Sequence, residues 1–286
     1  MGKSDMPSGH SKRRVSYIVL CVSLVLVTVV FGVRATYIPG VYYTLAVVQF
    51  TVIGLAAWKL GAWAIRAHAE ERRKLAVAGG LLILPFALFS LLAGMGPPGL
   101  GQTHAENQMR YLTLLINAIA ITGGLVVLKE ALSVAGERFY STLGFAAIML
   151  ATPLYLFWAT ILLEAHSSQD LVSSGQVPPW ANFLSEMSDI LLFFGGVLTY
   201  LATAAFAASL GRTQWLGRIA TRAFTTASFF AVLCLVIRGL QFPDPTVVFR
   251  HWYDIPGFVV GIPAVPWIMP CLFGVVLLRR VGNEQR

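Results

Sequence analysis

The sequence predicts an all-α integral membrane protein, a bundle of eight transmembrane helices whose N-terminus and C-terminus are both cytoplasmic. Three observations support this fold class: the composition, the long apolar runs and the distribution of basic residues. Of the 286 residues, 57% are hydrophobic and only 12% are charged, and the mean hydropathy is +0.72. Soluble domains carry about 25% charged residues. The charged fraction here is too small to cover a surface that faces water, so lipid must surround most of the chain.

Eight apolar runs have, or nearly have, the length of about 20 residues that a helix needs to cross a bilayer. These runs are continuous rather than alternating, and they are too long for the strands of a membrane barrel. In chain order, the predicted spans are residues 15–33, 42–64, 75–94, 111–128, 139–163, 190–210, 223–240 and 255–278. The seventh is the weakest of them, because it is short and ends near Arg238.

One membrane domain with short tails accounts for the whole chain. Residues 1–14 are predicted to form a basic cytoplasmic tail, residues 15–280 the eight-helix transmembrane domain, and residues 281–286 a second cytoplasmic tail. The first apolar run is longer than the roughly 7–15 residues of a signal peptide. No cleavage site of small residues follows Phe31. We therefore expect the first helix to stay uncleaved.

The basic residues fix the predicted orientation. With the N-terminus inside, 17 of the 21 Lys and Arg residues fall in cytoplasmic segments, and only Arg34, Arg110, Arg238 and Arg250 fall outside. Membrane proteins keep positive charge on the cytoplasmic side in this way. The net charge of +8 therefore reflects topology, and no nucleic-acid partner is expected. The predicted location is a multi-pass position in a plasma membrane of the bacterial inner-membrane type.

Candidate ligand-binding residues lie at the predicted outer face. Glu186 and Asp189 are three residues apart, so they share one face of a helix, and the sixth apolar run starts directly after Asp189. Arg238 lies at a similar depth at the end of the seventh run. A charge costs roughly 2.5–3.5 kcal/mol at the centre of a membrane helix and less near the interface. These residues therefore either form a fixed ion pair with helix capping, or bind a substrate or a proton.

The eighth predicted span has an unusual number of prolines. Pro256, Pro263, Pro266 and Pro270 all lie in it, with Trp267 between the last two. Because proline removes a backbone donor and clashes with the preceding turn, the span is predicted to be kinked or broken. Broken helices line binding sites in transporters, which makes Trp267 a candidate for substrate contact. A kink that only shapes packing is the alternative.

A metal site is the second candidate. His104, His166 and His251 come from three predicted outer loops and have the carboxylates of Glu106, Glu164 and Asp254 nearby. Three imidazoles could hold zinc and leave one position for water, which would then act as a nucleophile. The spacings match no known metal motif, so ordinary polar loop residues are the alternative. No other cofactor follows from the residues.

Three functional hypotheses follow from these sites. In the first, the protein binds or transports a small molecule or lipid through Glu186, Asp189, Arg238 and Trp267 near the extracytoplasmic face. In the second, it is an outer-leaflet enzyme that uses the three histidines, with or without a metal. In the third, it is a non-catalytic scaffold that assembles with other membrane proteins. Membrane lipids are expected partners in every case.

Overall fold

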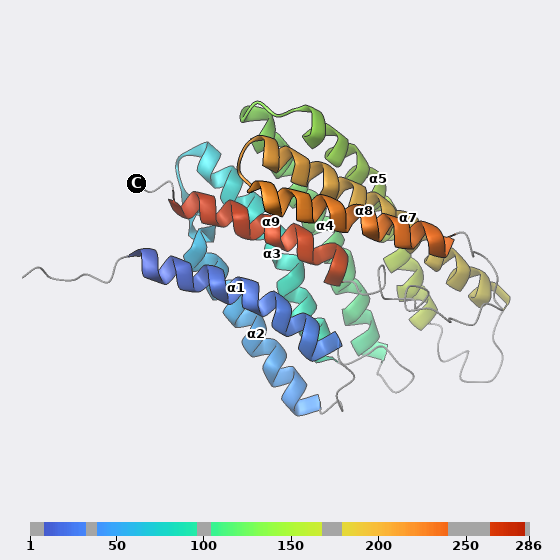
Figure 1. Ribbon diagram of the computed structural model, residues 1–286. Helices are drawn as coiled ribbons and strands as arrows, with labels where there is room; N and C mark the ends of the chain where they lie inside the picture. The colour runs from blue at the N-terminus through green and yellow to red at the C-terminus, as the bar shows by residue number, and fades with distance from the viewer. Residues whose placement is uncertain (1–8, 33–38, 96–103, 168–178, 240–263, 284–286) are drawn as a thin grey trace, which may run out of the picture.

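A computed structural model describes residues 9–32, 39–95, 104–167, 179–239 and 264–283. Within these ranges the chain forms eight α-helices and one short 3-10 helix, and it contains no strand (Figure 1). The elements are α1 (Gly9–Gly32), α2 (Pro39–Leu60), η1 (Ala62–Arg66), α3 (Glu70–Gly94), α4 (His104–Val134), α5 (Phe139–Ser167), α7 (Pro179–Arg212), α8 (Arg218–Gly239) and α9 (Ala264–Asn283).

Six of the described helices are long and apolar enough to cross a membrane, namely α2, α3, α4, α5, α7 and α8. Their outward surfaces carry large apolar side chains. Val47 on α2 is 58% exposed, Leu150 on α5 is 62% exposed and Phe229 on α8 is 56% exposed. Such surfaces suit hydrocarbon rather than water, so the chain has the character of a membrane-embedded helical protein. The first and eighth predicted spans, which correspond to α1 and α9, are not among the six and stay predictions.

The bundle is organised around α3. This helix packs against α4, α9, α2 and α1, and the chain continues from α4 to α5, then to α7 and finally to α8 (Figure 1). In the apolar stretch of α3, 61% of the residues are buried, compared with 22% of those in the apolar stretches of α2 and α8. The largest core cluster therefore lies around α3, with Leu82 and Phe86 almost fully buried in it.

Successive helices alternate in direction, which gives the bundle two distinct ends. We call the end at which α1, α3, α5 and α8 begin the basic end, because most Lys and Arg residues of the described chain lie there. A guanidinium N–H of Arg13 on α1 donates to the carbonyl oxygen of Gly282 on α9, so the first and last helices meet at this end. Arg110 and Arg238 lie toward the opposite end.

Aromatic rings hold the cations of the basic end. The guanidinium carbon of Arg280 lies 4.5 Å from the ring centroid of Trp215. The corresponding distance is 4.7 Å for Arg279 and Tyr17. Such cation–π contacts contribute about 0.5–2 kcal/mol. They hold these two arginines in place at the basic end of the bundle.

Glu137 joins two helices at the same end. Its carboxylate accepts hydrogen bonds from the backbone N–H groups of Tyr140 (2.9 Å) and Ser141 (3.1 Å), which caps the start of α5. The hydroxyl group of Ser209, near the end of α7, donates to the same carboxylate. Burial alone would raise the pKa of Glu137, but the bond from Ser209 and the backbone donors outweigh it and hold that pKa below its ordinary value. Glu137 is therefore a charged clamp between α5 and α7.

A seam of glycines joins α9 to α2 and α3; it consists of Gly61, Gly79, Gly274 and Gly282. A Cβ at Gly274 would lie 2.7 Å from the carbonyl oxygen of Gly79, so only glycine allows the two backbones to approach this closely. The second predicted span is too long, and the contacts of Gly61 explain why. We expected a helix over 42–64, but α2 ends at Leu60, and Gly61 packs against the backbone of Leu278 before η1 begins.

The remaining helix bounds differ mainly at the polar ends. The predicted run 111–128 extends to His104–Val134 in α4, and 190–210 extends to Pro179–Arg212 in α7. Hydropathy marks only the part of a helix that lies in hydrocarbon, so polar turns beyond it were missed. Likewise, α1 begins at Gly9, inside the segment 1–14 that we assigned to a tail.

The proline-rich eighth span is only partly described. Helix α9 begins at Ala264, and the part of the predicted span before it, 255–263, lies outside the described residues. Pro266 falls in the first turn of α9, where proline is tolerated, and Pro270 lies inside the helix. Helices α3 and α5 also contain an internal proline, at Pro85 and Pro153. An internal proline therefore does not distinguish α9 from the other helices of the bundle.

Candidate functional site

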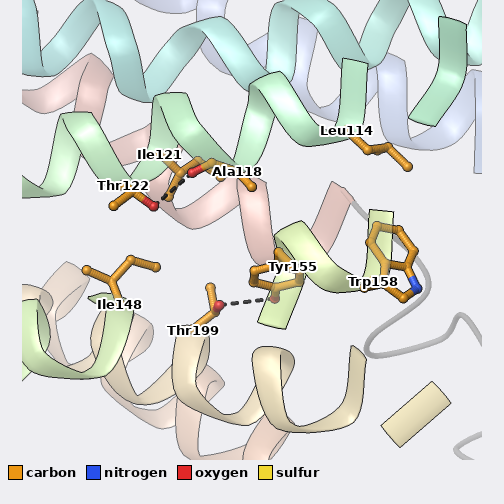
Figure 2. A pocket seen from close by; sticks show the side chains of 8 residues that line it. All are labelled: Leu114, Ala118, Ile121, Thr122, Ile148, Tyr155, Trp158 and Thr199. Carbon is orange, nitrogen blue, oxygen red and sulfur yellow. Dashed lines mark hydrogen bonds between the residues drawn. The ribbon is translucent and has the colours of Figure 1, made fainter. Parts of the chain in front are cut away.

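A small cavity lies between α4, α5 and α7, roughly midway along these helices (Figure 2). Its volume is about 20 Å³, which holds roughly one water molecule. Six of its lining side chains are apolar or aromatic, and the other two are threonines. The lining residues are Leu114, Ala118, Ile121, Thr122, Ile148, Tyr155, Trp158 and Thr199.

Two hydroxyl pairs cross the helix interfaces at this cavity. The hydroxyl oxygens of Thr122 on α4 and Thr152 on α5 are 2.6 Å apart. The hydroxyl oxygens of Tyr155 on α5 and Thr199 on α7 are 3.0 Å apart, and both side chains point into the space between the helices (Figure 2). A hydroxyl group carries one donor and two acceptor positions. The pairs therefore leave acceptor capacity for a polar molecule in the cavity.

Asn117 is the most unusual polar residue near the cavity. It lies on α4 between Leu114 and Ile121, which both line the cavity, and its exposed fraction is 0%. Neither its amide nitrogen nor its amide oxygen has a hydrogen-bond partner among the described residues. Leaving a buried polar group without a partner costs about 1–3 kcal/mol. A group of this kind calls for a water molecule or a ligand that completes its hydrogen bonds.

A buried polar face continues from Asn117 toward the end opposite the basic end. Asn107 and Arg110 lie on the same side of α4 as Asn117, and they are only 1% and 7% exposed. Gln49 on the neighbouring α2 is 9% exposed, and its amide nitrogen is another buried atom that lacks a partner within the described chain. We call Asn107, Arg110 and Asn117 the polar face of α4.

A hydrogen bond between α2 and α4 lies beside this face. The hydroxyl group of Tyr43 donates to a carboxylate oxygen of Glu106, at 2.9 Å. Glu106 belongs to the first turn of α4, not to a loop as we predicted. The bond joins α2 and α4 at the end opposite the basic end, where the polar face begins.

The four predicted ligand-binding residues lie near one end of the bundle, where α4, α7 and α9 begin and α5 and α8 end. Glu186 and Asp189 belong to the first third of α7, Arg238 to the last turn of α8 and Trp267 to the first turn of α9. Their side chains are outside the described part of the structure. The predicted ion pair of Arg238 with Asp189 or Glu186 therefore stays a prediction.

Two of the three predicted metal ligands, His104 and His166, lie in helical turns at the same end. His104 is the first residue of α4 and His166 lies in the last turn of α5, so both belong to helices rather than to loops as we expected. Their side chains, and the whole of His251, lie outside the described residues. In the part of the chain that is described, no three His, Cys, Asp or Glu residues come close enough to hold a metal ion.

Sequence reasoning found the charged residues but missed the neutral amides. Arg110 was assigned to an outer loop, while Asn107, Asn117 and Gln49 were not considered. The spacing of Asn107, Arg110 and Asn117, at i, i+3 and i+10, could have shown that one face of the fourth helix is polar. Comparison with protein families, with curated proteins and with solved structures finds no match for this chain.

Proposed function

We propose that the protein binds a small polar molecule, and carries it across the bilayer, through a site that opens at the end opposite the basic end. The observation that carries the proposal is Asn117, which has a fully buried amide and no hydrogen-bond partner among the described residues. A protein keeps a costly buried amide where a ligand or water completes its hydrogen bonds.

The packing of α5 against α7 supports an opening in this direction. Nearer the basic end the two helices are in close contact, because a Cβ at Gly144 would lie 2.8 Å from the ring of Phe206. Nearer the other end the gap is filled by the ring of Tyr155, which lies over Gly195. Separation of α4, α5 and α7 at that end would enlarge the cavity, whereas the present volume of about 20 Å³ corresponds to a closed state.

Charge supports the same route. Arg110 lies two turns from Asn117 on the polar face of α4, and it is only 7% exposed. In the proposal, Glu186, Asp189, Arg238 and Trp267 surround the entrance, and the polar face of α4 leads inward from it. The small cavity favours a compact molecule over a lipid.

The orientation belongs to the proposal as well. We place the basic end in the cytoplasm of a bacterial-type cell, since cytoplasmic segments carry the excess of Lys and Arg. The entrance then faces the extracytoplasmic side. The first and eighth predicted spans complete the membrane domain.

Cysteine accessibility tests the proposal without knowledge of the ligand. In a chain whose native Cys21, Cys234 and Cys271 are replaced by alanine, the cavity-lining Ala118→Cys and Thr199→Cys variants would be exposed to a membrane-impermeant methanethiosulfonate on intact cells. We expect both to be modified, because water must reach a site that loads from outside.

Two control positions set the background for this labelling. Val275→Cys on α9 is buried and away from the cavity, since Val275 is 1% exposed, and Leu112→Cys on α4 faces outward, since Leu112 is 48% exposed. Neither should react. The proposal fails if Ala118→Cys and Thr199→Cys react no faster than Val275→Cys.

A further inference from the structure

A second, larger cleft lies at the basic end, between the start of α3, the end of α4 and the start of α5. Its volume is about 370 Å³, which falls within the range of roughly 300–1,000 Å³ that is usual for small-molecule sites. Its lining residues are Lys74, Val126, Val127, Lys129, Glu130 and Phe145. It shares no residue with the cavity between α4, α5 and α7.

The chemistry of the cleft changes along the helix axes. Lys129 and Glu130 lie closer to the end of α4 than Val126 and Val127 do, and Phe145 lies two turns inside α5. The charged groups therefore form the rim, and the apolar groups form the part that points into the membrane layer. A phospholipid has the same order, with a charged headgroup above its acyl chains.

The two lysines of the rim are positioned to bind an anion. The ammonium group of Lys74 lies 2.8 Å from a carboxylate oxygen of Glu70, in a pair whose side chains are 33% and 67% exposed. An exposed ion pair of this kind contributes only about 0–1 kcal/mol, so Lys74 can turn to another anion at little cost. The ammonium group of Lys129 lies 5.9 Å from the ring centroid of Phe145, which directs it over the cleft.

From this lining we infer that the cleft binds the headgroup of an aminophospholipid, of the phosphatidylethanolamine type, in the leaflet at the basic end. Lys74 and Lys129 bind the phosphate, and Glu130 binds the primary ammonium group. Two cations and one carboxylate match a zwitterionic headgroup better than a purely anionic one. Val126, which is 37% exposed, and Phe145 contact the first part of an acyl chain. This site is independent of the proposed transport function.

Native mass spectrometry of the purified chain in detergent tests the inference. The protein would be titrated with phosphatidylethanolamine, phosphatidylcholine and phosphatidylglycerol. We expect phosphatidylethanolamine to bind most tightly. The double variant Lys74→Ala/Lys129→Ala should weaken its binding at least roughly tenfold, because both phosphate contacts are lost.

The matched control is the double variant Arg218→Ala/Arg222→Ala, which removes the same charge from exposed positions at the start of α8. It should bind like the parent chain. Glu130→Gln should retain binding but lose the preference for phosphatidylethanolamine over phosphatidylglycerol, which a purely structural glutamate would not affect.

A competition experiment distinguishes a bound lipid from a soluble molecule that carries the same polar groups. Phosphoethanolamine and inorganic phosphate should not displace the lipid at equal concentration, because they lack the acyl chains that contact Val126 and Phe145. Equal affinity for phosphoethanolamine would overturn the assignment to a lipid. Unchanged lipid binding in the Lys74→Ala/Lys129→Ala variant would overturn the site itself.

Discussion

At the glycine seam of α9 the helix backbones touch, whereas between α4, α5 and α7 side chains hold the helices apart and leave a cavity. The seam is tightly packed, and a Cβ has no room at Gly79 or Gly274. The cavity region instead contains two hydroxyl pairs, and α4, which lines the cavity, also carries the buried amide of Asn117. Close packing resists opening, so we expect the seam to stay fixed and the helices around the cavity to separate.

The largest effect is expected from a methyl group in the seam. In Gly274→Ala, the new Cβ would meet the carbonyl oxygen of Gly79 at 2.7 Å and a side-chain carbon of Ile83 at 2.8 Å. Since a backbone atom cannot move aside, α3 and α9 must separate, at a cost of about 1–3 kcal/mol or more. Thermal unfolding in detergent measures the loss.

A glycine in open space supplies the control for this prediction. Nothing lies within 4 Å of a Cβ built at Gly54 on α2, so Gly54→Ala should match or slightly exceed the stability of the parent chain. Equal melting temperatures for the Gly274→Ala and Gly54→Ala variants would show that the seam does not depend on backbone contact.

The cavity region should respond in the opposite direction. Replacing Asn117 with Leu removes two buried polar atoms that have no partner among the described residues, so the free energy of unfolding should rise, by about 1–3 kcal/mol. The same variant should reduce labelling of Ala118→Cys, because the site becomes apolar. A lower melting temperature would instead mean that the amide has a structural partner.

The charged clamp at the basic end gives a pH-dependent prediction. Because the pKa of Glu137 is held below its ordinary value, its contribution to stability is present above the pKa of the unfolded chain and is lost as the pH falls through the folded pKa. Glu137→Gln should therefore destabilise the protein at pH 7, by about 1–2 kcal/mol. The difference from the parent chain should shrink in melting curves at pH 4, and a constant difference would contradict the clamp.

The smallest effect is expected from the tyrosine hydroxyl in the cavity. In Tyr155→Phe the bond to Thr199 is lost, but Thr199 still donates to the backbone oxygen of Gly195, at 2.8 Å. Hydrogen bonds between membrane helices contribute about 0.6 kcal/mol on average, so melting should change little. Labelling of Ala118→Cys, in which Thr199 is retained, should become faster in the Tyr155→Phe background, since one contact that closes α5 on α7 is gone.

The sequence predicted the helical membrane class and the positions of the six helices described as candidate spans, because continuous apolar runs and alternating basic segments are strong signals. Helix ends were less predictable. The chain leaves α2 at Gly61 because Leu278, more than 200 residues away, packs there, and no local pattern contains that contact.

The candidate site was predicted only in part, for a related reason. Charged residues such as Asp189 and Arg238 stand out in an apolar sequence, and their positions on α7 and α8 do lie near one end of the bundle. A neutral amide such as Asn117 barely changes the hydropathy of a span. Its importance depends on which face of α4 is buried, and packing against neighbouring helices decides that.

Hydrogen–deuterium exchange of the protein in nanodiscs compares the two regions in one experiment. If water reaches the site between α4, α5 and α7, amides near Asn117 and Thr199 should exchange well before those near Gly79 and Gly274, although all four lie in apolar parts of their helices. Equal protection of both regions over the full time course would contradict the division of the bundle into a fixed seam and an opening site.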